Sequence, residues 1–400
     1  MTRAKIGAVL ALLCLAGPVR AETRIKIGVL NDRSGPYADV TGEGSLVAAR
    51  LAVQDFDPAA HGMIVEVISA DHQNKPDVGA AIARRWIDSE GVDVVSDVPT
   101  SSVALAVNEV VRQKDRILLV SGGGTSELTG KACSPNTVQW TYDSWAAVNG
   151  VAEATVRQGG DTWFFLTADY AYGTAAQADA TAAIAKAGGR VVGAVRAPFP
   201  TTDYSSYLLQ AQASRAKVIG LANAGPDTTN SIKQAAEFGI AAQGQRLVAL
   251  LMFINDVHSL GLPSAQGLSF TAATYWDLND ATRAFAAKFR EQLHRDQAPN
   301  DPQMGVYSSI THYLKAVAAV GTKDAATVMR QMKATPIDDP FFGSGRIRPD
   351  GRAIHVMYLM EAKRPDESSS PWDLLKIVAT IPAERAFRPM ENSGCPLGNK

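Results

Sequence analysis

Small and hydroxyl-bearing residues follow several short apolar runs in this chain, and we first ask what kind of ligand such residues could bind. Gly122-Gly123-Gly124 comes directly after the run ILLV, but it lacks the Lys-Ser/Thr that completes a phosphate-binding P-loop. Consecutive glycines leave backbone N–H groups open to an anion. This segment therefore predicts a backbone nest for a carboxylate.

Motifs for covalent catalysis and cofactor binding are weak in comparison. The nucleophile elbow Gly-x-Ser-x-Gly is absent, and the Ser-x-x-Lys at 214–217 lies at the end of a predicted surface helix. Gly42-Glu43-Gly44 resembles part of a dinucleotide fingerprint, but it stands roughly a dozen residues after the preceding strand. Asp71 occupies a place where an acid binds ribose, which leaves a secreted NAD-dependent dehydrogenase as an alternative. We expect no enzyme activity and no cofactor.

Charge and composition exclude several classes of protein. The chain has 39 Lys and Arg against 40 Asp and Glu, and no stretch concentrates basic residues as nucleic-acid binding requires. A hydrophobic content of 46% is too high for a disordered chain. The apolar runs are too short to span a bilayer. A length of 400 residues favours two lobes over one core.

The N-terminus has the pattern of an export signal. Arg3 and Lys5 precede the apolar run 6–17, and Val19-Arg20-Ala21 places small residues at both recognition positions of signal peptidase. We predict that residues 1–21 are a signal peptide and that the mature protein is periplasmic.

Export places the mature chain in an oxidising compartment, where Cys133 and Cys395 are the two cysteines that remain. We expect them to form a disulfide; two unrelated buried thiols are the alternative. Two distant cysteines cannot make a zinc site unaided, and no two histidines have metal-ligand spacing. No metal site is expected.

Short β-branched runs alternate with amphipathic segments along the mature chain, and the alternation occurs twice. The predicted strands are 25–30, 63–69, 92–95, 117–120, 163–167, 190–195, 217–221 and 247–253. Helical segments between parallel strands cover both faces of a sheet, so we predict an α/β fold with two doubly wound lobes. Segments 354–361 and 374–380 predict a closing antiparallel pair. In such sheets ligands bind beyond the carboxyl ends of the strands.

Several segments, in order, resemble the periplasmic solute-binding proteins of branched-chain-amino-acid-type ABC importers. They are IKIGVLNDRSGPYADVTGEGSLVAARLAVQDF, VVSDVPTSSVALAV, ILLVSGGGTSELT and LTADYAYGTA. TYWDLNDATRAFAAKF and MGVYSSITHYLKAV resemble a subgroup associated with aromatic or other small carboxylic acids. The resemblance covers essentially the whole mature chain. It implies the type I periplasmic binding fold, in which two lobes joined by three crossovers close on a solute.

The resemblance also implies how the chain divides. Lobe 1 takes residues 22–144 and 274–353, and lobe 2 takes 145–273 and 354–390. A C-terminal tail, 391–400, follows.

Ligand-binding positions follow from the same resemblance. Ser101 and Thr125 match a Ser and a Thr that bind the ligand carboxylate in the family, and Ser102 is an adjacent alternative. Their loops lead into predicted helices, whose N-termini attract anions. The competing interpretation is that both residues only cap those helices.

The remaining candidates supply aromatic, polar and apolar contacts. They are Tyr172, Asn223, Phe253, Met252, Trp145 and, as a cover over the cleft, Tyr37. For Tyr172 the alternative is packing on a helix start. The apolar members suit an aromatic ring.

The chain departs from the family where amino-acid binders hold the ligand ammonium. Ala224 and Met252 stand nearest to the positions of the aromatic hydroxyl and the acid that do this. A buried ammonium without a partner is costly. We therefore predict a carboxylate ligand without an α-amine, most simply an aromatic acid. A branched-chain or other amino acid is the alternative, since Asp227 could supply the acid; we expect Asp227 instead to N-cap its helix.

The combined interpretation is a non-enzymatic, monomeric solute-binding component of an ABC importer. Its partners are a small carboxylate and the permease and ATPase complex of the inner membrane, with no nucleic acid. The alternative from another class is a ligand sensor for a membrane receptor.

Overall fold

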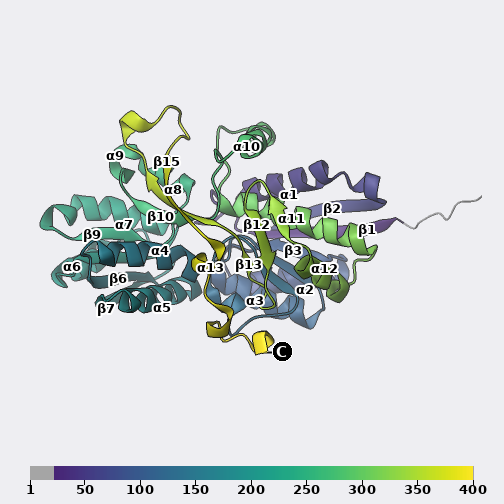
Figure 1. Ribbon diagram of the computed structural model, residues 1–400, viewed down its shortest axis with the longest axis horizontal. Coiled ribbons are helices and arrows are strands. Elements are labelled where there is room, and N and C mark those ends of the chain that lie inside the picture. Colours follow the sequence, from purple (N-terminus) through teal and green to yellow (C-terminus); the bar gives the residue numbers. More distant parts are fainter. Residues whose placement is uncertain (1–21, 400) are drawn as a thin grey trace, which may run out of the picture.

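A computed structural model describes residues 22–399, so the predicted signal peptide, 1–21, lies outside the described residues. Two lobes stand side by side, each built on its own parallel sheet (Figure 1). The sheet of lobe 1 has the order β2-β1-β3-β4-β5. Its strands are β1 (Thr23–Asn31), β2 (Met63–Asp71), β3 (Val94–Asp97), β4 (Ile117–Val120) and β5 (Thr137–Gln139).

Helices from two distant parts of the chain cover this sheet. They are α1 (Gly42–Phe56), α2 (Pro76–Ser89), α3 (Ser101–Gln113), α10 (Asp280–Leu293), α11 (Asp301–Val320) and α12 (Ala325–Ala334). Helix α11 packs along α1, which brings the later segment into lobe 1. Gly28 in β1 permits close packing, because a Cβ there would lie 2.5 Å from the ring of buried Trp86 in α2.

Lobe 2 repeats the architecture on a sheet of order β7-β6-β8-β9. Its strands are β6 (Thr162–Ala168), β7 (Arg190–Ala197), β8 (Val218–Ala222) and β9 (Arg246–Ala249). Its helices are α4 (Ser144–Arg157), α5 (Ala171–Lys186), α6 (Ser205–Ala213), α7 (Pro226–Glu237), α8 (Ile254–Leu260) and α9 (Leu262–Ala265). The parallel pairing predicted from the alternating runs is confirmed in both lobes.

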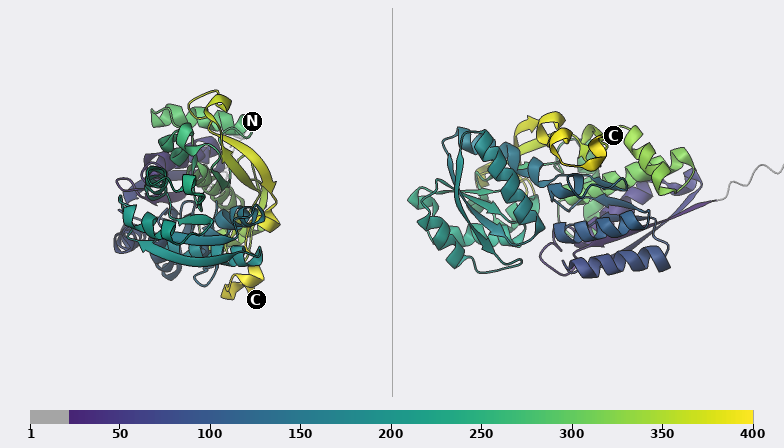
Figure 2. Two further views of the ribbon diagram at one scale, coloured as in Figure 1. Left: turned by 90° about the vertical axis from the view of Figure 1, so that its left-hand side faces the viewer. Right: turned by 90° about the horizontal axis from the view of Figure 1, so that it is seen from below.

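The chain passes between the lobes three times: after β5, after β10 (Ser269–Ala272) and after β13 (Ala353–Ile354). Two small antiparallel sheets lie near these passages, as Figure 2 shows. Their other strands are β11 (Ile337–Asp339), β12 (Gly343–Ile347), β14 (Met357–Ala362) and β15 (Leu375–Ile381), and α13 (Ala383–Ala386) follows. The predicted closing pair is confirmed as β14 and β15. The residue boundaries of the two lobes stay a prediction.

The strand expected at 247–253 is wrong in its second half. Strand β9 ends at Ala249, and Leu250 to Phe253 form a loop whose apolar side chains are buried. An apolar run predicts burial, but it does not distinguish a strand from a loop that walls a cavity.

The C-terminal tail is held against lobe 1 by a disulfide. Cys133 and Cys395 are bonded, with their Cα atoms 5.7 Å apart, so the predicted pairing is present in the structure. The bond encloses a separation of 262 residues. The bond therefore ties the end of the chain to the loop region that follows β4.

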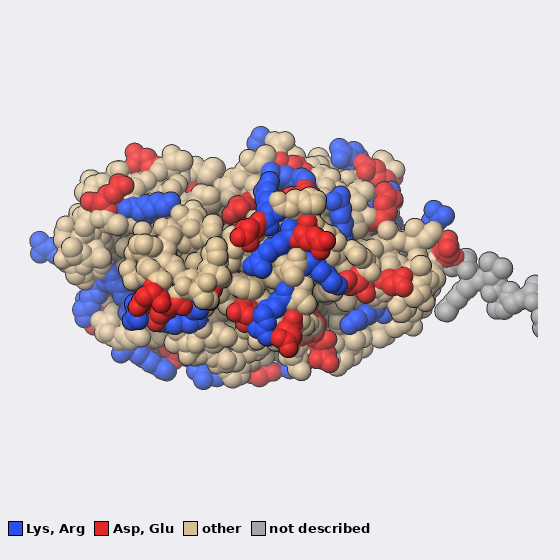
Figure 3. Space-filling model, turned by 90° about the horizontal axis from the view of Figure 1, so that it is seen from above, with Lys and Arg blue, Asp and Glu red and all other residues tan. Residues whose placement is uncertain are grey.

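Basic and acidic side chains are interspersed on the face of the molecule in Figure 3. Among residues 22–399, no helix combines the length and apolarity needed to cross a bilayer. Within the same residues, no cluster of three or more His, Cys, Asp or Glu could hold a metal ion.

Candidate ligand-binding site

A cavity lies between the lobes, beyond the carboxyl ends of the strands in both sheets, with about 300 Å³ of empty space that is partly open to solvent. Lobe 1 lines it with Tyr37, Val40, Thr41, Pro99, Ser101, Gly122, Gly124, Tyr142 and Pro302. Lobe 2 lines it with Tyr170, Tyr172, Ala224, Leu251 and Phe253. None of these lining residues is Lys, Arg, Asp or Glu.

Two loops of lobe 1 offer free hydrogen-bond donors to this cavity. Ser101 is the first residue of α3, and its Oγ accepts a hydrogen bond from the Thr125 N–H at 3.1 Å. The Ser101 hydroxyl proton therefore remains available to donate. Gly124 lines the cavity, and its N–H has no hydrogen-bond partner among the described residues. Together with the positive end of α3, these groups make a candidate anion seat, a term we keep for the Ser101 hydroxyl and the Gly124 N–H.

The loop from Gly122 to Thr125 is fixed from behind. The Gln139 side-chain amide donates to the carbonyl oxygens of Gly123 at 2.8 Å and Thr125 at 3.0 Å. The Tyr142 hydroxyl donates to the Gly122 carbonyl at 2.8 Å. These bonds occupy the carbonyls of Gly122, Gly123 and Thr125, while the N–H groups of Gly123 and Gly124 have no partner among the described residues.

Glycine is required at position 124 for steric reasons. A Cβ there would lie 2.9 Å from the Tyr142 ring and 3.1 Å from the Tyr172 ring. The missing side chain lets tyrosines from the two lobes approach the same stretch of backbone.

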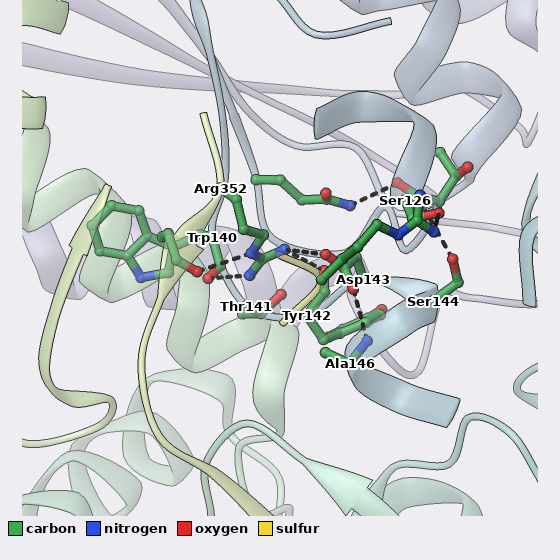
Figure 4. Close-up of polar contacts among 12 residues, drawn as sticks. Ser126, Trp140, Thr141, Tyr142, Asp143, Ser144, Ala146 and Arg352 are labelled. Carbon is green, nitrogen blue, oxygen red and sulfur yellow. Dashed lines mark hydrogen bonds and ion pairs between the residues drawn. The ribbon is translucent and has the colours of Figure 1, made fainter. Parts of the chain in front are cut away.

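Tyr142 is positioned by a buried arginine at a passage between the lobes (Figure 4). The Arg352 guanidinium is fully buried and donates to the carbonyls of Trp140 at 2.8 Å and Tyr142 at 2.9 Å. It also lies 3.7 Å from the carboxylate of Asp143. Asp143 in turn accepts from the N–H of Ala146 and caps α4. This network holds the strand end that carries Tyr142.

Three buried acids lie behind the wall near Tyr142 without entering the lining. Burial raises the pKa of Asp97 to about 7, that of Asp256 to about 7 and that of Asp301 to about 6. Asp97 ends β3, and its Oδ1 has no hydrogen-bond partner among the described residues. Asp97 and Asp256 are therefore partly protonated near pH 7, whereas Asp301 is mostly ionised there.

The lobes are in contact over the cavity. The Tyr37 and Tyr170 hydroxyls are 2.6 Å apart, and the Phe199 ring stacks on both tyrosines. Nearby, the Asn255 amide from α8 donates to the Asp39 carbonyl at 3.2 Å. The conformation is thus the closed one, with a cavity walled from both sides.

Four of the predicted site residues meet at the cavity: Ser101, Tyr37, Tyr172 and Phe253. Ser102 is partly exposed and does not line it. Thr125 is buried behind the lining, where its Oγ1 accepts from the Glu127 N–H at 3.3 Å and caps a short 3₁₀ helix.

The other predicted residues point elsewhere. The Asn223 side chain is buried in lobe 2, where its amide donates to Ser231 at 3.1 Å and its oxygen accepts from Thr228 at 2.8 Å. Met252 packs in the core of lobe 2. Trp145 lies under the Arg388 guanidinium at a separate surface groove. The structure does not bring these three to the cavity.

The capping role expected for Asp227 is wrong. Helix α7 begins at Pro226, and its N-cap is Gly225 rather than Asp227. Gly225 adopts a positive φ of 59°, a conformation that suits glycine. Asp227 falls in the first turn, is only 2% exposed and does not line the cavity.

Sequence reasoning missed two lining tyrosines. Tyr170 stands in the same DYAYG segment as Tyr172, and its place before a helix was a usable signal. Tyr142 follows β5, a strand of 3 residues that gives no clear alternation pattern.

Comparisons with known proteins place these features in a family. The family model described as periplasmic binding protein matches residues 24–368. A periplasmic binding protein from Burkholderia mallei is 47% identical, with a TM-score of 0.91 over 94% of this chain and 99% of that one.

Two further solved structures are similar. A branched chain amino acid ABC transporter periplasmic ligand-binding protein from Burkholderia xenovorans LB400 is 38% identical, with a TM-score of 0.83 over 94% of this chain and 100% of that one. An ABC transporter solute binding protein from R. palustris, solved in complex with benzoate, is 20% identical, with a TM-score of 0.80 over 94% and 100%. At 20% identity, the similarity to the benzoate complex shows only that the two proteins share a fold. The two-lobed fold, its interlobe cavity and the matched family model together show that this chain belongs to the periplasmic binding protein family.

Proposed function

We propose that this protein is the exported, non-enzymatic solute-binding component of an ABC importer and that it captures a small aromatic carboxylate. One observation carries the choice of ligand. The cavity combines free N–H and O–H donors on one side with aromatic walls on the other, and no charged side chain lines it.

A carboxylate suits the donor side of the cavity. Ser101 can donate its hydroxyl proton, Gly124 can donate its N–H, and α3 adds the positive end of its dipole. An anion can be held by such groups without a countercharge. A benzene ring suits the remaining wall, where Tyr142, Tyr172 and Phe253 present faces and edges.

An amino acid is the second candidate, because the 38% identical relative is described as a branched chain amino acid ABC transporter protein. One feature of the chain favours it. Asp227 Oδ2 is buried without a hydrogen-bond partner among the described residues. Against it, Asp227 does not line the cavity, so its carboxylate is not placed to meet a ligand ammonium.

Capture works by closure of the two lobes. Each lobe supplies part of the cavity wall, so a bound molecule favours the state in which both parts are in contact with it. We propose that the closed, monomeric protein delivers its ligand to the permease in the inner membrane. A receptor that senses the closed form is the alternative partner.

Calorimetric titration of the mature protein, residues 22–400, with benzoate and with leucine tests the proposal. We expect benzoate to bind with a Kd of about 1–10 μM, a free energy of roughly −7 to −8 kcal/mol, and leucine to give no heat of binding. Micromolar leucine binding with no response to benzoate would reverse the choice. Refolding the protein from denaturant before titration removes any ligand carried through purification.

A further inference from the structure

We propose that the hydroxyl pair Tyr37–Tyr170 is a specificity determinant that reads a hydrogen-bond acceptor on the ligand, at the end opposite its carboxylate. This inference rests on the proposed function, because it assumes an aromatic acid in the cavity. The pair joins the two lobes: Tyr37 follows β1 of lobe 1, and Tyr170 precedes α5 of lobe 2.

Counting protons shows why the pair is incomplete. Burial raises the pKa of both tyrosines far above neutral pH, so each hydroxyl keeps its proton. The 2.6 Å contact between the two oxygens uses one of these protons. Neither hydroxyl has any other hydrogen-bond partner among residues 22–399. One O–H donor is therefore left over at the edge of an apolar cavity that both residues line.

The surroundings offer this donor no acceptor of their own. Phe199 stacks on both rings, with centroids 5.6 Å from Tyr37 and 4.3 Å from Tyr170. The Asp227 carboxylate is near enough to affect the pKa of both tyrosines, but no hydrogen bond joins it to either one. An unused buried donor costs free energy, and a ligand acceptor would remove that cost.

Sheet order places the pair away from the anion seat. In lobe 1, β1 is separated by β3 from β4, so the loop that carries Tyr37 lies about two strand spacings, roughly 10 Å, from the loop that carries Gly124. Ser101, after β3, stands between them. A benzene ring with its carboxylate on Ser101 and Gly124 can extend toward Tyr37. The atom that meets the hydroxyl pair is then a substituent opposite the carboxylate.

Phenylalanine variants give the proposal a distinctive signature. If one tyrosine loses its hydroxyl, the other keeps a proton and can still donate. If both lose it, no donor remains. The single changes Tyr37→Phe and Tyr170→Phe should therefore cost little selectivity, whereas the double variant should lose it, a strongly non-additive result.

The measurement is the ratio of dissociation constants for 4-methylbenzoate and 4-hydroxybenzoate, which have nearly the same size. For the wild type we expect this ratio to favour 4-hydroxybenzoate about tenfold, the value of one hydrogen bond. Each single variant should keep a preference of at least about sevenfold, whereas the double variant should fall to about twofold, well below the roughly fivefold that two additive losses would leave. Phe199→Leu disturbs the same contact but leaves both hydroxyls, so it is the matched control and should keep the preference.

The outcomes separate this inference from the proposed function. If no benzoate derivative binds to the wild type, the proposed function fails first. If both acids bind with equal affinity to the wild type, the hydroxyl pair does not read the ligand. A single variant that abolishes the preference alone would also overturn the inference, because one remaining hydroxyl should suffice. If the double variant does not fold, the ratio of the two dissociation constants in the wild type still tests whether the hydroxyl pair recognises the ligand.

Discussion

The two lobes bring different chemistry to one cavity. Lobe 1 presents the polar groups, which are the Gly122–Gly124 backbone and the Ser101 hydroxyl, and it also adds the rings of two tyrosines. Lobe 2 adds only aromatic and apolar residues, among them Tyr172 and Phe253. Groups fixed in a rigid loop can orient an anion, whereas aromatic side chains provide area and shape. We infer that lobe 1 selects the charged group and that aromatic rings of both lobes select the body of the ligand, which lobe 2 encloses on closure.

Gly124→Ala should have the largest effect on binding, because aromatic rings of both lobes pack around Gly124. The new Cβ would press on rings from both lobes, so the closed state loses about 2–3 kcal/mol and benzoate affinity falls roughly 30- to 150-fold. The melting temperature of the unliganded protein should change little. Unaltered affinity in calorimetry would mean that the ligand does not need this closed arrangement.

Ser101→Ala tests the donor side of lobe 1 alone. Loss of a buried hydrogen bond to an anion should weaken benzoate binding by about 1.5–3 kcal/mol. Ser102→Ala is the matched control, since Ser102 is adjacent but does not line the cavity. Thr125→Ala should have a smaller effect than Ser101→Ala, because Thr125 lies behind the lining. A larger loss in the Thr125 variant would move the seat away from Ser101.

The buried acid Asp97, behind the lobe 1 wall of the cavity, should make the stability of the protein depend on pH. Burial raises the pKa of Asp97 to about 7. Between the unfolded value near 4 and this folded value, the folded protein binds the extra proton, so its stability falls as pH rises through that window. From pH 5 to pH 8 the free energy of unfolding should drop roughly 2 kcal/mol more in the wild type than in Asp97→Asn. Equal pH profiles in urea denaturation would show that Asp97 does not titrate as described.

Phe253→Leu tests the lobe 2 side and should have the smallest effect. The change keeps an apolar wall but removes one aromatic partner, which is worth about 1 kcal/mol. Affinity for benzoate should fall about fivefold, while affinity for cyclohexanecarboxylate should stay within about twofold. Equal losses for both acids would show that Phe253 fills space without recognising a ring.

Much of the fold follows from local patterns. Apolar runs that alternate with helical segments predict the parallel strands of both lobes, because central strands such as β3, β4 and β8 are buried on both faces. The resemblance to the family pointed to Ser101 and Tyr172, and both line the cavity at the strand ends, where ligand sites in this architecture lie. The side-chain direction of Asn223 could not be predicted, because it depends on Thr228 and Ser231 in the next helix. Tyr142 depends on Arg352, which is 210 residues away in sequence.

A crystal structure of the benzoate complex would show which lobe binds the carboxylate. We expect its oxygens within hydrogen-bond distance of the Gly124 N–H and the Ser101 hydroxyl, with the ring between Tyr142, Tyr172 and Phe253. A carboxylate bound instead by lobe 2, or an acidic side chain reaching into the cavity beside the ligand, would contradict this expectation.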